Sequence, residues 1–202
     1  MKTELSCREH YDALIDENND PVHDPAPLRD YMDKWDGQTF LDALTLTGSE
    51  SVLEIGVGTG RLALRIAPLC GHFTGIDLSE KTAERARENL AGHPNVTVLT
   101  GDFTEYGFVG TFDVICSSLT FMHIEDKQQA VSKAASLLSP GGRLVISIDK
   151  NPADVIDCGT RLVKIHPDSP ENISLSMKNA GLTVVSVTGT EFAHILSAIK
   201  DN

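Results

Sequence analysis

The chain has 202 residues and a formal net charge of −12, with 29 acidic against 17 basic side chains. That length allows one domain with a sizeable core, and the apolar share of 41% is ordinary for a folded protein. An acidic surface repels a phosphate backbone, so we expect no nucleic-acid partner and a weak preference for neutral or cationic small molecules. No apolar run approaches the length of a membrane span, so no membrane partner is expected either.

The four cysteines indicate a reducing compartment. Cys7, Cys70, Cys116 and Cys158 form no CxxC pair, and the start of the chain does not resemble a signal peptide. We therefore expect reduced thiols in a cytoplasmic protein. The seven histidines show no paired spacing, so we expect no metal site. A monomer and a homodimer both remain open.

The first fifty residues differ from the rest of the chain. The segment NNDPVHDPAP is rich in turn-forming residues and is predicted to be a loop. Leu28, Met32, Trp35, Phe40 and Leu44 then predict one amphipathic helix, with Trp35 as a core anchor. We expect residues 1–45 to form a helical lid or cap and residues 46–202 to form the main body of a single-domain protein.

Strands and helices alternate from residue 51 onward. Five strands are predicted at Ser51–Ile55, His72–Asp77, Asn95–Leu99, Phe112–Ser117 and Arg143–Asp149. The helices between them are predicted at Gly60–Leu69, after the N-cap residue Ser79, and at Glu125–Leu138. This order predicts an α/β fold, a Rossmann-like doubly wound and mostly parallel sheet that binds ligands at the carboxyl ends of its strands.

The end of the chain departs from this alternation. Ser169 and Pro170 open a helix that Gly181 closes. Two strands follow, Leu182–Val187 and Glu191–Ile199, separated by only three residues. Because a parallel crossover needs a dozen residues or more, this link predicts an antiparallel hairpin.

A glycine-rich turn follows the first of the five strands, in the segment Glu54-Ile55-Gly56-Val57-Gly58-Thr59-Gly60. Glycines allow the turn and let a ligand approach the backbone. Several nucleotide-binding families use such a loop, but a dinucleotide fingerprint would place its third glycine at position 61, where Arg61 stands. No GK[ST] follows, which excludes a nucleoside-triphosphate P-loop.

Two acidic residues end the next strands. Asp77 closes the second strand in GIDLS, where an acidic side chain can accept hydrogen bonds from a ribose diol. A helix cap is the alternative for Asp77, but Ser79 already fills that role. Asp102 follows the third strand in LTGDF, and its spacing from Asp77 favours an adenine contact over a solvated turn.

The motifs VLEIGVGTG, GIDLS, VLTGDF, FDVICSSLTFMHIED and LLSPGGRLVISID, in this order, resemble the class I S-adenosylmethionine (SAM)-dependent methyltransferases. The likeness is greatest to the small-molecule branch called the type 11 or type 25 methyltransferase domain, and it covers about residues 40–150. It implies a seven-stranded sheet with an antiparallel last strand, with SAM as cofactor and S-adenosylhomocysteine (SAH) as product. The main body, residues 46–202, would then be the SAM-binding domain.

The resemblance also implies roles for individual residues. The methionine part of SAM would lie over the glycine turn, with Glu54 orienting its amino group. The adenosine part would be held farther along the sheet, and the methyl-transfer mouth would lie at Ser117 with Ser118 and Leu119. The full set of implied cofactor-binding residues is Glu54, Gly56, Gly58, Thr59, Gly60, Asp77, Leu78, Asp102, Phe103, Ser117 and, from the lid, Tyr11.

Methyl transfer from SAM is an in-line displacement, so alignment in a dry pocket is the main requirement. His123, in SSLTFMHIED, is the one candidate general base, and a packing role at the start of the next helix is the alternative. The segment Asp154–Pro167 is a candidate second flap over the acceptor. Its Arg161 and Lys164 could meet an anionic acceptor, although surface charge is the preferred interpretation.

The absence of one known motif narrows the class of substrate. Cys116-Ser117-Ser118-Leu119 replaces the (N/D)PP(Y/F) motif, which argues against methylation of adenine or glutamine amino groups. We therefore predict a methyltransferase acting on a small-molecule acceptor. Two alternatives remain: a SAM-binding regulatory module without turnover, and an NAD-dependent oxidoreductase, against which Arg61 and the terminal hairpin speak.

Overall fold

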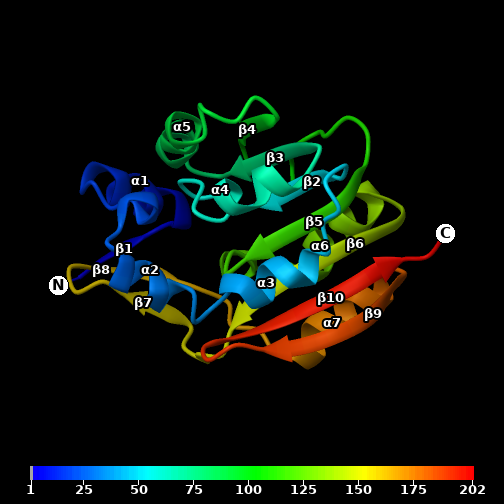
Figure 1. Ribbon diagram of the computed structural model, residues 1–202. Coiled ribbons are helices and arrows are strands. Elements are labelled where there is room, and N and C mark those ends of the chain that lie inside the picture. Colours follow the sequence, from blue (N-terminus) through cyan, green and yellow to red (C-terminus); the bar gives the residue numbers. More distant parts are fainter. Residues whose placement is uncertain (1) are drawn as a thin grey trace.

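The computed structural model describes residues 2–202, which form two sheets (Figure 1). The larger has seven strands in the order β4-β3-β2-β5-β6-β10-β9. They are β2 (Ser51–Ile55), β3 (His72–Asp77), β4 (Val96–Thr100), β5 (Phe112–Ser118), β6 (Leu138–Asp149), β9 (Leu182–Gly189) and β10 (Ala193–Lys200). The first five run parallel, and β10 is antiparallel to both of its neighbours. The predicted Rossmann-like sheet and its reversed terminal hairpin are confirmed.

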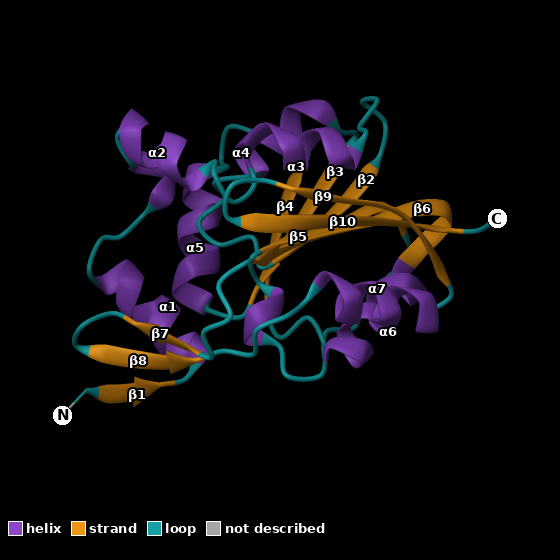
Figure 2. Cartoon of the chain, turned by 90° about the horizontal axis from the view of Figure 1, so that it is seen from below, coloured by secondary structure: helices purple, strands orange, loops and turns teal. Residues whose placement is uncertain are grey.

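Helices cover both faces of this sheet (Figure 2). One face carries α3 (Gly37–Leu44), α4 (Ala63–Ile66) and α5 (Glu80–Asn89), and the other carries α6 (Lys127–Leu137) and α7 (Pro170–Asn179). Each layer has its own apolar core, because the strands are buried on both faces and read as continuous apolar runs. Short 3-10 turns stand at η1 (Pro21–His23), η2 (Ala67–Leu69) and η3 (Phe121–His123).

The N-terminal segment contributes to two layers. It contains β1 (Thr3–Leu5), α1 (Cys7–Asp16) and α2 (Ala26–Met32) before α3 packs its buried Phe40 and Leu44 on the large sheet. The single helix predicted between Leu28 and Leu44 was wrong, since α2 ends at Met32 and α3 begins at Gly37. Gly37 has a φ of +50° and the side chain of Asp36 accepts its backbone N–H, so the chain turns there and a new helix begins.

A second, three-stranded sheet joins the two ends of the sequence. Its order is β1-β8-β7, with β7 at Val155–Asp157 and β8 at Arg161–Lys164. β1 runs parallel to β8, and Figure 2 shows this sheet beside α1, apart from the large sheet. The lid segment and the predicted second flap therefore form one unit. Among residues 2–202 no helix has both the length and the apolar character needed to cross a bilayer.

Candidate functional site

Three adjoining cavities follow the carboxyl ends of the parallel strands. The first, of about 370 Å³, lies between α1, the ends of β3 and β4, and η3. The second, of about 190 Å³, lies over the glycine turn, and the third, of about 420 Å³, lies beyond the ends of β5 and β6. Tyr11 and Gly56 line both the first and the second cavity, whereas Met32 and Leu119 line both the second and the third. The cavities therefore form one continuous path.

The glycine turn has a backbone with positive φ angles, and at Gly56 it leaves no room for a side chain. Gly56 has a φ of +75°, and a Cβ added to it would lie 2.1 Å from Oγ1 of Thr120. Gly58 has a φ of +56° and donates its backbone N–H to Oδ2 of Asp77 at 3.0 Å. A residue with a Cβ at position 56 would collide with the loop after β5, so this position requires glycine.

Glu54 lies at the floor of the second cavity without a partner for its carboxylate. The residue is 2% exposed, and its Oε2 atom is buried without a hydrogen bond in the described chain. Burial raises the pKa of this carboxyl to about 8, although the positive charge of Arg61 acts in the opposite direction. A buried carboxylate that lacks a donor is costly, so this atom is available for an ammonium group.

Asp77 joins the glycine turn to the start of α5. Its Oδ1 accepts the backbone N–H of Ser79 at 2.9 Å, while Oδ2 accepts that of Gly58. The hydroxyl of Ser79 caps α5 by accepting the N–H of Thr82, as predicted. Burial raises the pKa of Asp77, and the two backbone donors oppose that shift. The carboxylate is thus held rigidly at the wall of the first cavity.

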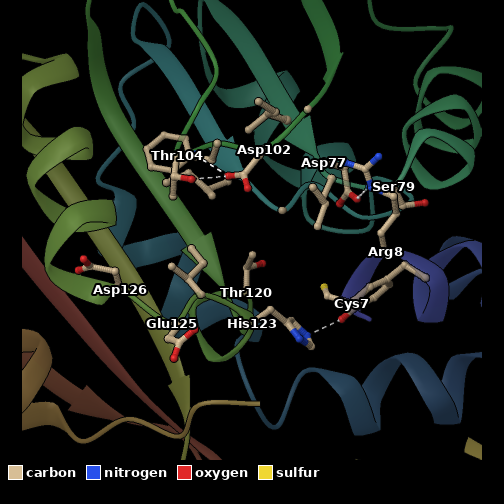
Figure 3. Close-up of a pocket in the computed structure, with 18 of the residues that line it drawn as sticks. Cys7, Arg8, Asp77, Ser79, Asp102, Thr104, Thr120, His123, Glu125 and Asp126 are labelled. Atoms are coloured by element: carbon tan, nitrogen blue, oxygen red, sulfur yellow. Dashed lines mark hydrogen bonds between the residues drawn. The ribbon is translucent and has the colours of Figure 1, made fainter. Parts of the chain in front are cut away.

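Leu78, Asp102 and Phe103 also line the first cavity. Oδ1 of Asp102 accepts two hydrogen bonds from Thr104, from its backbone N–H and from its hydroxyl, each at 2.7 Å. Phe103 is buried in the core beneath. Figure 3 shows Asp102 and Thr104 on one side of the cavity and Asp77 and Ser79 on the other. These residues face a space that an adenosine-sized group could occupy.

Three further candidate cofactor-binding residues, Thr59, Gly60 and Ser117, differ in whether they reach a cavity. Thr59 lines the second cavity, and its hydroxyl is buried without a hydrogen bond. Gly60 faces Leu90 of the core, whose nearest methyl carbon would be 3.1 Å from an added Cβ. Ser117 is fully buried and donates its hydroxyl to the carbonyl of Ile55 at 3.0 Å. Gly60 and Ser117 thus support the walls of the cavities from behind, and their predicted contact with cofactor stays a prediction.

His123 and Tyr11 close the first cavity from opposite sides. The phenol oxygen of Tyr11 lies 3.0 Å from Nε2 of His123, and Nδ1 of His123 is buried without a partner. Burial lowers the pKa of His123 to about 4 and raises the pKa of the Tyr11 phenol well above its usual range. In Figure 3 the imidazole points across the cavity toward the helix that carries Cys7 and Arg8. Both groups are therefore neutral at pH 7.

One buried ion pair at the second cavity has no signal in the sequence. Arg61 lines this cavity and forms an ion pair with Asp36, donating two hydrogen bonds to its carboxylate. The side chain of Asp36 is 0% exposed. Asp36 also accepts the hydroxyl of Ser118 at 2.8 Å. The contact ties the glycine turn to the start of α3. Asp36 stands within the segment that the sequence predicts as one amphipathic helix, and no pattern distinguishes it from the neighbouring acids Asp30 and Asp33.

The structure changes the interpretation of two other residues. Arg161 is not a surface charge: it is buried, and its guanidinium binds Glu17 and donates to Nδ1 of His10. Trp35 is half-buried and packs against the half-buried Phe192, outside both core clusters, and it lines the third cavity and donates its indole N–H to Asp149 at 3.1 Å. Trp35 is therefore part of the wall of the site and not the core anchor that the sequence predicted.

Sequence comparisons relate part of this chain to methyltransferases. Residues 52–142 match a family model described as a methyltransferase domain. A protein of Anoxybacillus flavithermus named an uncharacterized methyltransferase is 36% identical over 121 residues, which cover 58% of this chain and 56% of the relative. One of Mycobacterium tuberculosis is 32% identical over 111 residues, covering 53% and 54%. The matches span about half the length of these curated relatives.

Solved structures extend the likeness over the whole fold. The N-methyltransferase NodS from Bradyrhizobium japonicum, crystallised with SAH, superimposes with a TM-score of 0.72 at 20% identity and covers 95% of this chain and 98% of its own. A SAM-dependent methyltransferase from Aquifex aeolicus gives 0.71 at 22% identity, covering 89% and 98%. Residues 52–142 thus match a methyltransferase domain, and the chain as a whole has the fold of SAM-dependent methyltransferases of known structure.

Proposed function

We propose that the protein binds SAM and transfers its methyl group to a small-molecule acceptor. The observation that carries this proposal is the unpartnered Oε2 atom of buried Glu54 beside the glycine turn. An α-ammonium group supplies the donor that this carboxylate lacks. Similar methyltransferase structures contain bound SAH or SAM, which supports the same cofactor here.

The first and second cavities would hold the two parts of such a cofactor. The second cavity, with Glu54, Thr59 and the glycine turn, would hold the methionine part. The first would hold the ribose at Asp77 and the adenine ring between Leu78, Asp102 and Phe103. Tyr11 stands where the two cavities meet. Gly60 and Ser117 complete the proposed set from behind the walls.

SAM supplies an activated methyl group on a sulfonium, so the protein's task is positioning. Met32 and Leu119 line the junction of the second and third cavities, which is where the methyl group would face an acceptor. The third cavity then holds the acceptor. Leu119 has a φ of +54°, a strained conformation that places its side chain at this junction. Closing α1 over the path excludes water from the reaction.

His123 stays the candidate base for an acceptor that must lose a proton. Its imidazole is neutral at pH 7, as a base must be, but a pKa of about 4 makes it weak. It lines the first cavity, whereas its neighbour Met122 lines the third. Its contact with Tyr11 supports a second role, which is to hold α1 in the closed position.

The domain organisation is also a proposal. We propose that residues 1–45 act as a cap on a methyltransferase domain formed by residues 46–202, within one domain overall. The pairing of β1 with β8 and the packing of α3 on the large sheet support a cap that is integral to the fold. A cytoplasmic location and a monomeric or homodimeric state stay predictions.

Thermal unfolding with SAM, SAH or NAD tests the cofactor. We expect stabilisation by SAM and SAH, and stabilisation by NAD alone would overturn the proposal. Turnover is then measured as release of SAH from SAM in the presence of an acceptor library. Binding of SAM without SAH release across that library would favour a regulatory module.

A further inference from the structure

The third cavity has an unusual combination of lining groups. Most of its wall is apolar, and the charged side chains that line it are all carboxylates: Asp149, Asp157 and Asp168. No Lys, Arg or His is among the residues that line it. At about 420 Å³ it is the size of a site for a small organic molecule. The charge of the wall therefore selects among acceptors.

Asp168 is the carboxylate among these three whose surroundings best indicate the charge of a ligand. Its side chain is 6% exposed, and Oδ2 is buried without a hydrogen bond in the described chain. The ammonium of Lys127 lies 3.3 Å from that oxygen. However, Lys127 also contacts the carbonyl oxygens of Phe121, Ile124 and His166 at hydrogen-bond distance. An ammonium has only three N–H donors, so Asp168 competes with three carbonyl oxygens for them.

The negative charge of Asp168 is therefore only partly compensated within the described chain. Lys127 gives it a neighbouring positive charge that is shared with three carbonyl oxygens. Burial raises the pKa of Asp168, and the charge of Lys127 only partly opposes that shift. A buried carboxylate whose ion-pair partner is shared with other acceptors recovers only part of the hydration that it has lost. A ligand that brings an N–H donor into the third cavity removes the remaining cost.

Asp149 adds a second negative charge to the same wall. Its Oδ2 accepts the indole N–H of Trp35, and its Oδ1 accepts the backbone N–H of Asn151 at 2.7 Å. Both donors are neutral, so neither compensates the charge. Two carboxylate oxygens offer about four acceptor positions, which leaves capacity for another donor. Asp157, in contrast, is paired with Lys2 at the exposed rim.

Trp35 supplies the third element of the site. Its ring lines the cavity next to Asp149, with Leu119 and Met122 elsewhere on the wall. An indole face attracts cations, and these apolar side chains would bury a hydrocarbon body. A carboxylate and an aromatic ring beside an apolar wall together favour a ligand that has both a charged end and an apolar end.

We propose that the methyl acceptor carries a cationic amine on an apolar or aromatic body, and that Asp168 binds the amine. The inference rests on the proposed function, in which the third cavity holds the acceptor. The ammonium of the ligand donates to Asp168, Asp149 adds long-range attraction, and the body lies against Trp35 and Met122. An anionic acceptor would be repelled, and an uncharged one would form at most a weaker hydrogen bond with Asp168.

Matched probes test this selectivity. The protein is saturated with SAH, and binding of 2-phenylethylamine, 2-phenylethanol and 3-phenylpropionate is measured by ligand-observed NMR and calorimetry. Tryptamine, tryptophol and indole-3-propionate form a second set on a larger body. We expect each amine to bind about tenfold or more tightly than its alcohol, because a charge-assisted hydrogen bond is worth about 1.5–3 kcal/mol. The carboxylates should bind most weakly.

Two variants and a matched control locate the effect. Asp168→Asn keeps the shape of the side chain and should remove most of the preference for amine over alcohol, and Asp149→Asn should reduce it less. Asp154→Asn makes the same charge change on an exposed side chain near the cavity and should leave the preference intact. SAH affinity, measured for each variant, reports that the fold and the cofactor site are preserved.

The outcomes separate this inference from the proposed function. Failure of the wild-type protein to bind SAH would overturn the proposed function itself. SAH binding with equal affinity for amine and alcohol, or with no probe bound, would overturn the inference alone. A preference for amines that survives Asp168→Asn would also overturn it. The wild-type comparison stands by itself if Asp168→Asn does not fold.

Discussion

The hydroxyl of Tyr11 in α1 and Nε2 of His123 in η3 lie 3.0 Å apart, although 112 positions separate them in the chain. This hydrogen bond crosses the mouth of the first cavity. On the opposite side of α1, Arg161 of β8 binds Glu17 just after the helix ends. The helix is therefore held over the site from two directions, by the loop after β5 and by the small sheet.

Replacing Tyr11 with Phe tests the first of these contacts. The variant loses one hydrogen bond, worth about 0.5–1.5 kcal/mol, and keeps the ring. We expect SAH to dissociate about two- to tenfold faster, because α1 opens more readily. Stopped-flow measurement of SAH release gives the rate. Tyr31→Phe, on an exposed tyrosine of α2, is the control. Equal release rates for the wild type and Tyr11→Phe would show that this bond does not hold the cap closed.

Glu54 should make cofactor binding depend on pH. Its pKa is raised from about 4.5 to about 8, so the folded protein retains a proton that the unfolded chain loses between these values. The folded state then binds more protons, and this group's contribution to the free energy of unfolding decreases as pH rises from about 4.5 to about 8.

An ammonium beside Glu54 favours the ionised carboxylate, so SAM binding at pH 7 should release a proton and strengthen toward pH 8. Calorimetry in two buffers of different ionisation enthalpy measures that release. Glu54→Gln should bind SAM about ten- to a hundredfold more weakly and lose the Glu54-linked proton release, because a charge-assisted hydrogen bond is lost. Glu105→Gln, on an exposed side chain, is the control. Identical proton release in wild type and Glu54→Gln would contradict this assignment.

Asp77→Ala should weaken SAM binding by on the order of 1–3 kcal/mol, since the ribose hydroxyls lose a charged acceptor. The variant also frees the backbone N–H groups of Ser79 and Gly58, so thermal unfolding without ligand must be recorded in parallel. Glu84→Ala removes an exposed acid from the same helix that Asp77 precedes and should have no effect. Unchanged SAM affinity by calorimetry would refute the ribose assignment.

Gly56→Ala should damage the fold around the site. The added Cβ would lie 2.1 Å from Oγ1 of Thr120, at a φ of +75° that side chains rarely adopt. We expect a loss of about 2–4 kcal/mol in the free energy of unfolding, together with weaker SAM binding. Gly92→Ala meets no atom within 4 Å and should be nearly neutral. A melting temperature for Gly56→Ala equal to that of Gly92→Ala would show that the turn can accommodate a Cβ atom at position 56.

The sequence alone determined the large sheet and the course of the chain through it. Short apolar runs that alternate with helix signals specify parallel strands, and a three-residue link specifies the hairpin of β9 and β10. The sequence also singled out the glycine turn and Asp77 as candidate site residues. Their signals lie within a few residues of a strand end, where backbone geometry dictates which residue types can stand.

Tertiary structure decided the contacts that close the site. The pairs Asp36 with Arg61, Tyr11 with His123, and Lys127 with Asp168 each join segments that are far apart in the sequence and become neighbours only when the chain folds. The sequence placed Arg161 on the surface, whereas burial against α1 made it structural. Such pairs depend on which segments become neighbours, and the cost of burying a charge is defined only once its partners are in place.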